Sequence, residues 1–241
     1  MSTSLRETME RAPARRSRQA VFDREAPAYD RVARASMPGY LDLHRTLVAG
    51  IPFVATRSFR LLELGVGTGT LTRMVLEEFP HAEVTGVDLS PRMIAEARRK
   101  LHAHRDRVRL VACDLERFEE APYDVVLSAL AIHHLTDAAK WRLFGRIHRI
   151  LPRGGYFGDA DDHLPEDPVF DRRYAEIATT LRPSGAPKSS WTSPQQVWHE
   201  HERLDHPSTV AAEVAALERA GFEHVGVPWR FFGQAVVWAY R

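Results

Sequence analysis

Three closely spaced glycines follow one apolar strand, and they are the strongest indication of a ligand-binding site in this sequence. Residues 60–64 have the pattern of a buried strand, and Gly65, Gly67 and Gly69 follow before a helical pattern begins. Glycine lets the backbone approach a ligand closely, and the N-terminus of the next helix offers backbone N–H groups. We therefore expect a ligand at the carboxyl end of this strand.

The spacing of these glycines distinguishes between the known classes of nucleotide-binding turn. A dinucleotide fingerprint needs G-x-G-x-x-G, whereas Thr70 stands at the sixth position here and the pattern is G-x-G-x-G. The Gly-Lys-Ser/Thr step of a Walker loop is missing from this turn. The spacing therefore argues against a dinucleotide enzyme and against a P-loop nucleotide hydrolase.

Two acids follow the next two expected strands. Asp88 comes after residues 83–87, nineteen residues beyond Gly69, where a carboxylate can accept hydrogen bonds from ribose hydroxyls. Asp114 follows residues 108–112, where a carboxylate can accept from an adenine amino group. An isolated acid at a strand end is often only a helix cap. Three strand ends in order, each with suitable chemistry, predict a ligand that contains adenosine.

Two adjacent histidines, His133 and His134, follow the fourth expected strand at residues 125–131. A neutral imidazole near pH 7 is suited to remove a proton from an oxygen or nitrogen atom. One ring can face a pocket while the other packs outward. The alternative is that both histidines are structural.

The fifth expected strand ends among acids. Asp159, Asp161, Asp162 and His163 could in principle form a metal site together with one of the two histidines. Consecutive side chains alternate in direction as the chain leaves a strand, so these groups cannot all converge. We therefore predict no metal ligands in this sequence.

Short apolar runs alternate with helical patterns through most of the chain. The expected strands cover residues 60–64, 83–87, 108–112, 125–131, 155–160, 222–227 and about 231–240. Strands that alternate with crossover helices form parallel sheets with helices on both faces. The sequence thus predicts an α/β, Rossmann-like, doubly wound and mostly parallel seven-stranded sheet.

Two segments lie outside this alternation. Residues 1–52 contain an arginine-rich tail and short helical patterns, and we expect them to form a helical lid. Residues 53–241 are expected to form the main domain, with a helical insert at about 162–206. Because the N-terminal helices could close their own site or a neighbour's, a homodimer is possible.

The composition narrows the class of protein. The chain has 241 residues, and its 33 basic and 32 acidic side chains give a net charge of +1, which disfavours a nucleic-acid partner unless the tail arginines form a local patch. The single cysteine, Cys113, excludes a disulfide within the chain and a multi-cysteine zinc site, and a cytoplasmic location is expected. No apolar run approaches the ~20 residues that span a membrane.

With these motifs the sequence resembles the class I S-adenosylmethionine-dependent methyltransferase family over about residues 21–162. The matching pieces are Glu63-Leu-Gly-Val-Gly-Thr-Gly, Val87-Asp88, Cys113-Asp114-Leu115, the segment from Tyr123 through His133-His134-Leu135, and Leu151-Pro-Arg-Gly-Gly-Tyr. The resemblance implies S-adenosylmethionine as cofactor. It also implies cofactor contacts from Tyr29, Glu63, Gly65, Gly67, Gly69, Asp88, Leu89, Asp114, Leu115 and Ala129.

The same resemblance implies methyl transfer to an oxygen, nitrogen or carbon atom of a small-molecule acceptor, within a biosynthetic pathway. Transfer from a sulfonium depends mainly on alignment and exclusion of water, and needs no covalent nucleophile. His133 and His134 are then the candidate bases. The candidate acceptor contacts are Tyr40, His163, Arg182 and Trp191, a set that favours a planar or anionic acceptor.

Two other functions compete with this interpretation. The segment Ser36-Met-Pro-Gly-Tyr is similar to enzymes that make or use carboxy-S-adenosylmethionine for wobble-uridine modification in tRNA. An alternative of another class is a scaffold that binds the cofactor without transferring a methyl group. The intact glycine turn, together with Asp88 and Asp114, argues against the scaffold.

Overall fold

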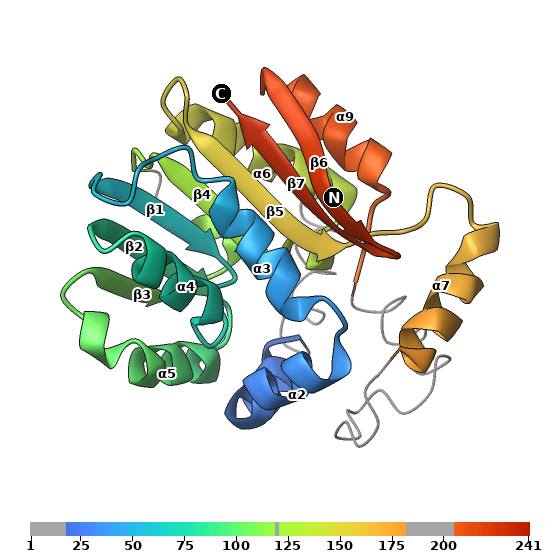
Figure 1. Ribbon diagram of the computed structural model, residues 1–241, viewed down its shortest axis with the longest axis horizontal. Helices are drawn as coiled ribbons and strands as arrows, with labels where there is room; N and C mark the ends of the chain where they lie inside the picture. Colours follow the sequence, from blue (N-terminus) through green and yellow to red (C-terminus); the bar gives the residue numbers. More distant parts are fainter. Residues whose placement is uncertain (1–17, 119–120, 182–204) are drawn as a thin grey trace, which may run out of the picture.

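A computed structural model describes residues 18–118, 121–181 and 205–241, and its centre is one twisted sheet (Figure 1). The sheet has seven strands in the order β3-β2-β1-β4-β5-β7-β6. They are β1 (Phe59–Leu64), β2 (Ala82–Asp88), β3 (Val108–Ala112), β4 (Val125–Ala129), β5 (Tyr156–Asp162), β6 (His224–Phe231) and β7 (Gln234–Tyr240). Strands β1 to β5 pair in parallel, and β7 is antiparallel to both β5 and β6. The predicted mostly parallel α/β sheet is confirmed.

The strand order reverses between β1 and β4. The chain first builds outward from β1 through β2 to β3, and then crosses back so that β4 pairs with the other edge of β1. In open parallel sheets such a reversal leaves a crevice outside the carboxyl ends of the two central strands. This crevice holds the glycine turn that follows β1.

Helices cover both faces of the sheet, as predicted. They are α2 (Tyr29–Ser36), α3 (Tyr40–Ala49), α4 (Thr70–Glu78), α5 (Pro91–Lys100), α6 (Asp137–Ile150), α7 (Val169–Thr180) and α9 (Val210–Ala220), with single turns η1 (Ala26–Ala28), η2 (His102–His104), η3 (Leu115–Arg117) and η4 (Ile132–His134). Residues 18–25 are also helical. Apolar side chains of α6 and α9 pack on one face, whereas those of α3, α4 and α5 pack on the other. None of the described helices is long and apolar enough to cross a membrane.

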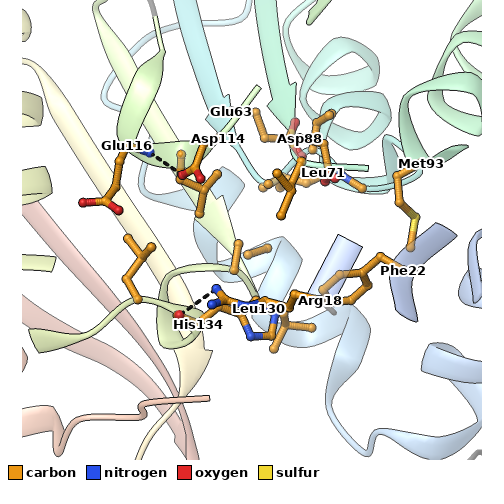
Figure 2. A pocket seen from close by; sticks show the side chains of 18 of the residues that line it. Arg18, Phe22, Glu63, Leu71, Asp88, Met93, Asp114, Glu116, Leu130 and His134 are labelled. Carbon is orange, nitrogen blue, oxygen red and sulfur yellow. Dashed lines mark hydrogen bonds between the residues drawn. The ribbon is translucent and has the colours of Figure 1, made fainter. Parts of the chain in front are cut away.

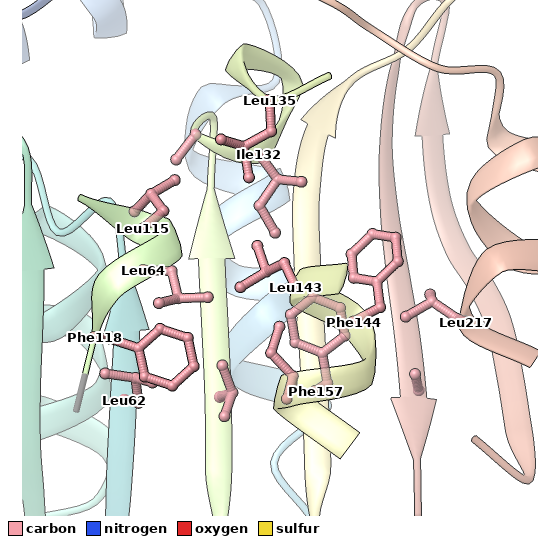
Figure 3. Close-up of a cluster of buried hydrophobic side chains, with 14 of the residues drawn as sticks. Leu62, Leu64, Leu115, Phe118, Ile132, Leu135, Leu143, Phe144, Phe157 and Leu217 are labelled. Carbon is pink, nitrogen blue, oxygen red and sulfur yellow. The ribbon is translucent and has the colours of Figure 1, made fainter. Parts of the chain in front are cut away.

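The central strands are apolar on both sides because both faces are covered. Val126 of β4 belongs to the cluster under α6 and α9, which Figure 3 shows with Phe144 and Leu217. Its neighbours Val125 and Leu127 face the opposite cluster under α3 and α4. A strand buried on both faces shows a continuous apolar run rather than alternation, which is the pattern that identified β4 in the sequence.

Several element boundaries differ from the predicted ones for local reasons. Strand β4 stops at Ala129, because Leu130 has a φ of 55° and turns the chain into η4. At the other edge, β6 extends through a register shift between Gly226 and Trp229 to Phe231. This irregularity contains Pro228. Proline lacks an N–H donor, and β6 tolerates it because one side of an edge strand pairs with no other strand.

The N-terminal segment packs directly on the sheet. Leu43 and Leu47 of α3 are buried in the cluster with β5, and the Tyr156 hydroxyl donates to the Leu47 carbonyl at 3.1 Å. Helix α7 follows β5 and stands beside the main body in Figure 1. Residues 182–204 of the predicted helical insert lie outside the described residues.

Candidate functional site

A cavity of about 860 Å³ opens at the carboxyl ends of the central strands (Figure 2). Its wall includes Arg18, Phe22, Tyr29, Tyr40, Glu63, Gly65, Gly67, Asp88, Leu89, Met93, Asp114, Leu115, Glu116, Ala129, Leu130, His134 and His206. In the close-up, Asp114 and Glu116 mark one end and Met93 with Phe22 the other, while His134 faces Asp88 across the space. Nine of the ten predicted cofactor contacts therefore share one cavity wall, and the tenth, Gly69, begins α4 beside it.

The glycine turn leaves bare backbone at this wall. Gly65 has a φ of 74°, and a Cβ there would lie 2.3 Å from the Cβ of Ala131. Gly67 has a φ of 51°, and a Cβ there would meet no atom nearer than the Gly65 carbonyl oxygen at 4.0 Å. The first glycine is thus required by packing and the second leaves its open side to the cavity. This cradle fits a ligand that approaches the backbone closely.

Asp88 lies at the tip of β2 and is fixed by backbone donors. One carboxylate oxygen accepts from the Gly67 N–H at 2.9 Å and the other from the Ser90 N–H at 2.8 Å. Burial raises the pKa of this carboxyl, although both backbone hydrogen bonds oppose the shift. Each oxygen keeps a second lone pair, so the carboxylate is suited to accept from two neighbouring hydroxyl groups of a ligand.

Asp114 and Leu115 form the next part of the wall. The Asp114 carboxylate accepts from the Glu116 N–H at 3.0 Å and caps η3, while its residue also lines the cavity. Leu115 is buried and presents an apolar surface beside Leu89 in the same cavity. The two interpretations of Asp114, as a cap and as a ligand contact, are therefore compatible.

Three titratable side chains of the cavity wall are shielded from water, Glu63 and Tyr40 fully and Tyr29 in part. Burial raises the pKa of Glu63 to about 8, so this carboxyl is mostly protonated at pH 7, and it is paired with the Thr72 hydroxyl. Tyr29 lines the cavity, and burial raises the pKa of its hydroxyl. Tyr40 also lines the cavity, and burial raises its pKa to about 12.

Of the two candidate bases, His134 is the one that lines the cavity. Its Nδ1 lies 2.5 Å from an oxygen of Asp205. Burial, followed by the charge of His133, lowers the pKa of His134 to about 4, so the ring is neutral at pH 7. A neutral ring that donates from Nδ1 to a carboxylate carries its basic lone pair on Nε2. His134 therefore has the protonation state of a base.

His133 is buried behind the wall and is paired with Asp161 of β5 through its ring Nδ1 and, at 2.7 Å, through its backbone N–H. Burial alone would lower its pKa, but the charge and hydrogen bond of Asp161 outweigh burial and raise it to about 9. The ring is therefore protonated near pH 7. Such a group is an internal cation, and a protonated ring has no lone pair with which to act as a base.

The prediction of His163 as an acceptor contact is corrected by its position. Its ring is buried between the Asp161 carbonyl oxygen at 3.0 Å and the Glu213 carboxylate at 2.8 Å, and it is not part of the cavity wall. Its two ring nitrogens are thus occupied by internal partners. Of the other three predicted acceptor contacts, Tyr40 lines the cavity, and Arg182 and Trp191 lie outside the described residues.

One group among the described residues could hold a metal ion. Ligand atoms of His133, His134 and Asp205 lie within 4.8 Å of one another. The His134 Nδ1 and the Asp205 oxygen are 2.5 Å apart, which is a hydrogen-bond distance and is short for two ligands of one ion. The geometry therefore fits a hydrogen-bonded pair better than a metal centre.

The sequence did not reveal several residues that line this wall or contact His134 from behind it. The Arg18 guanidinium donates to the His134 carbonyl oxygen at 2.7 Å, across 116 residues of chain. The Phe22 ring meets the His134 ring edge-on, with 5.3 Å between centroids. Asp205 reaches His134 across 71 residues. No local motif marks such partners, because only the folded chain brings them together.

Two acids, Asp23 and Asp30, tie the N-terminal helices to the turn after β2, to the glycine turn and to α5. The Ser90 hydroxyl donates to Asp23 at 2.5 Å. Asp30 accepts from the Thr68 hydroxyl at 2.5 Å and forms an ion pair with Lys100, which also donates to Thr68 at 2.8 Å. Despite burial, these bonds lower the pKa of Asp30, so it is ionised near pH 7. Residues 18–36 thus form a strap across the cavity.

Comparison with known proteins decides the family. A family model described as a methyltransferase domain matches residues 61–155. An uncharacterized methyltransferase of Geobacillus sp. (strain WCH70) is 31% identical over 157 residues, which are 64% of this chain and 68% of that relative. The chain belongs to the class I S-adenosylmethionine-dependent methyltransferase family. S-adenosylmethionine is accordingly its cofactor, as the motifs predicted.

Relatives of this methyltransferase serve different acceptors. The demethylmenaquinone methyltransferase of Thermus thermophilus is 34% identical over 56% of this chain and 61% of its own length. The solved structure of phosphoethanolamine N-methyltransferase 2 of Haemonchus contortus, in complex with phosphomonomethylethanolamine and S-adenosylhomocysteine, is 25% identical with a TM-score of 0.64. That match covers 85% of this chain but 43% of the solved one, so the acceptor does not follow from the comparison.

Proposed function

We propose that this methyltransferase acts on an oxygen or nitrogen atom of a small-molecule acceptor, with His134 as the base. The observation that carries the proposal is the position of a neutral His134 ring in the same cavity wall as the glycine turn and Asp88. A base must be neutral at the working pH and must reach the cavity where the acceptor binds. His133 satisfies neither condition.

The cofactor contacts of the proposal follow the wall from β1 to η3. Asp88 would hold the ribose hydroxyls, and Asp114 with Leu115 would hold the adenine. The Gly65 and Gly67 backbone would pass under the methionine and ribose. Glu63, Tyr29 and Ala129 would surround the amino-acid end, and Leu89 the ribose. The open cradle at Gly67 and the remaining lone pairs of Asp88 support this fit.

The protein's part in the reaction is alignment and proton removal. S-adenosylmethionine, when bound, supplies an electrophilic methyl group. The cavity wall aligns the acceptor atom with it and excludes water, effects that can contribute ~7–11 kcal/mol in favourable cases. As the acceptor atom forms its new bond to carbon, Nε2 of His134 takes its proton. His134 then becomes an imidazolium, which the adjacent Asp205 carboxylate stabilises.

The size of the cavity favours a small acceptor. A volume of about 860 Å³ lies within the ordinary range of small-molecule sites, ~300–1,000 Å³, and must hold the cofactor as well. Phe22 and Tyr40 supply aromatic surface, and Arg18 supplies a guanidinium, so a planar or anionic small molecule is the class to test first.

A panel of phenols, carboxylic acids and amines, with bulk tRNA as a further candidate, tests this proposal by mass spectrometry of the methylated product. For the acceptor found, His134→Gln should lower kcat by ~10²–10⁴. The dissociation constant of S-adenosylhomocysteine should stay within about twofold of the wild-type value. A His134→Gln enzyme with full kcat would contradict the base role. Methylation of tRNA but of no small molecule would contradict the acceptor class.

A further inference from the structure

A short segment that returns from the insert closes the wall behind His134. It consists of residues 205–208, and hydrogen bonds to several elements hold it in place. The His206 N–H donates to the His133 carbonyl oxygen at 2.6 Å, and the Ser208 carbonyl oxygen accepts from the Leu164 N–H at 3.0 Å. The segment is thus hydrogen-bonded to the turn between β4 and α6 on one side and to the residues after β5 on the other.

Lys140 of α6 provides two further contacts. Its ammonium donates to the His206 carbonyl oxygen and to the Ser208 hydroxyl at 2.6 Å. The Ser208 hydroxyl in turn donates to Asp137 at 2.8 Å. Lys140 is buried, with 4% of its surface exposed, which is unusual for a lysine on an amphipathic helix. A buried ammonium that binds a loop backbone is a specific anchor for that loop.

The anchored segment places the Asp205 carboxylate against His134. Groups from three directions face this ring: the Asp205 carboxylate at Nδ1, the His133 ring with its centroid 4.0 Å away, and the Phe22 ring. The nearby Arg18 guanidinium binds the backbone carbonyl rather than the ring. Asp205 is therefore the group among the described residues that fixes which ring nitrogen carries the proton.

We propose that Asp205 is a positioning residue for methyl transfer, which holds Nε2 of His134 as the proton acceptor, and that Lys140 holds Asp205 in place. This inference rests on the proposed base role of His134. A neutral imidazole has two tautomers, and a carboxylate on Nδ1 selects the one with a basic Nε2. An amide in place of the carboxylate can donate to Nδ1 instead, which would put the proton on the wrong nitrogen.

The test compares single and double variants in steady-state kinetics and in binding of S-adenosylhomocysteine. Asp205→Asn should lower kcat about 100-fold, an effect of the kind that tautomer loss produces in histidine-carboxylate dyads of hydrolases. Asp205→Glu should retain more of kcat than Asp205→Asn. The dissociation constant of S-adenosylhomocysteine should change less than about twofold in both. Asp106→Asn, an exposed acid remote from the cavity wall, is the matched control.

A double-mutant cycle separates positioning from a merely structural effect. In a His134→Gln background, Asp205→Asn should cost less than about threefold, because its target has been removed. Lys140→Met should lower kcat about tenfold on its own and add little to Asp205→Asn. If Asp205→Asn does not fold, the cycle of Lys140→Met with His134→Gln carries the same test.

The possible outcomes distinguish this inference from the proposed function. Full activity of His134→Gln would overturn both. Loss of activity in His134→Gln, with full activity in Asp205→Asn or with independent, multiplying effects of the two changes, would overturn the inference and leave the base role standing. Equal loss of kcat and cofactor binding in Asp205→Asn would show a structural role and would also overturn the inference.

Discussion

The cofactor side and the acceptor side of the cavity are built in different ways. On the cofactor side, the glycine turn, Asp88 and Asp114 follow three neighbouring strands, β1, β2 and β3, at one sheet edge. On the acceptor side, His134 meets Arg18 from the N-terminal helix and Asp205 from the far end of the insert. The first side is set by strand register, and the second by the docking of distant segments.

This difference indicates which parts of the chain determine cofactor binding and which determine the choice of acceptor. Parallel strands in register place their carboxyl ends at one edge of the sheet, and this placement does not depend on loop conformation. The cofactor side therefore depends on few contacts outside the sheet. The acceptor side depends on the strap and on the segment 205–208, which belong to the parts of the chain that flank or interrupt the sheet. We therefore expect substitutions on the two sides to separate cofactor binding from turnover.

The largest effect is expected from Gly65→Ala on the cofactor side. The new Cβ would lie 2.3 Å from Ala131 and the residue would keep a left-handed backbone, so the turn must move. Affinity for S-adenosylhomocysteine, measured by calorimetry, should fall at least about 100-fold. The control is Gly145→Ala in α6, where a Cβ meets nothing within 4 Å and helix propensity improves. Unchanged affinity in Gly65→Ala would contradict the cradle.

On the acceptor side, the protonation state of His134 should determine the pH dependence of kcat. His134 is a base only when neutral, and its pKa of about 4 keeps it neutral as the pH falls from 7 to 5.5. The rate at pH 5.5 should therefore remain within about 20% of that at pH 7. A histidine with an ordinary pKa of about 6.5 would lose roughly eightfold over the same interval. A rate profile with a midpoint near 6.5 would contradict the burial of this ring.

A smaller effect is expected where the strap joins the cofactor side. Asp30→Asn removes the ion pair with Lys100 but keeps an oxygen that can accept from Thr68. Dissociation of S-adenosylhomocysteine, followed by stopped-flow fluorescence, should become about three- to tenfold faster, because the strap opens more easily. The control is Asp42→Asn, which removes an exposed ion pair with Arg45. Equal rates in Asp30→Asn and Asp42→Asn would show that the strap does not retain the cofactor.

The smallest effect on activity is expected at Asp159, which lies in β5 between β4 and β7 and is not part of the cavity wall. Its carboxylate is fully buried, and burial and then the charge of Glu213 raise its pKa well above the usual range, although a hydrogen bond with the Ser128 hydroxyl opposes the shift. The folded state therefore binds a proton that the unfolded state releases above about pH 4, and stability falls as pH rises.

Replacing Asp159 with a residue that does not titrate should remove this dependence of stability on pH. Asp159→Asn should leave kcat unchanged and should raise the free energy of unfolding at pH 7.5, with little change at about pH 3, because the carboxyl is then mostly protonated in both states of the wild type. Each unit of raised pKa that is removed corresponds to about 1.4 kcal/mol. Urea unfolding at the two pH values measures this difference. A loss of stability at pH 7.5 would show that Asp159 is ionised in the folded protein.

The sequence predicted most residues of the cavity wall between the glycine turn and Asp114, because the signals for these positions are local. The glycine spacing and the acids at 88 and 114 are adjacent in the chain to the strands that position them. The choice between His133 and His134 needed the structure, since both lie in one turn and differ in burial and partners. His163 was misplaced because its partner Glu213 lies fifty residues away.

The rest of the acceptor side gave no local signal. Asp205, Arg18 and the anchor Lys140 are ordinary charged residues until the chain folds, and their contacts span 71, 116 and 66 residues. The division into residues 1–52 and 53–241, a homodimer and a cytoplasmic location stay predictions.

Calorimetric titration with S-adenosylhomocysteine tests the central claim most directly, namely that the cofactor binds along the ends of β1, β2 and β3. The account predicts one binding site in the wild type and in His134→Gln. In Asp88→Ala the affinity should fall at least about 100-fold, because two charge-assisted hydrogen bonds of ~1.5–3 kcal/mol each are lost. Wild-type affinity in Asp88→Ala, or no binding by the wild-type protein, would contradict the account.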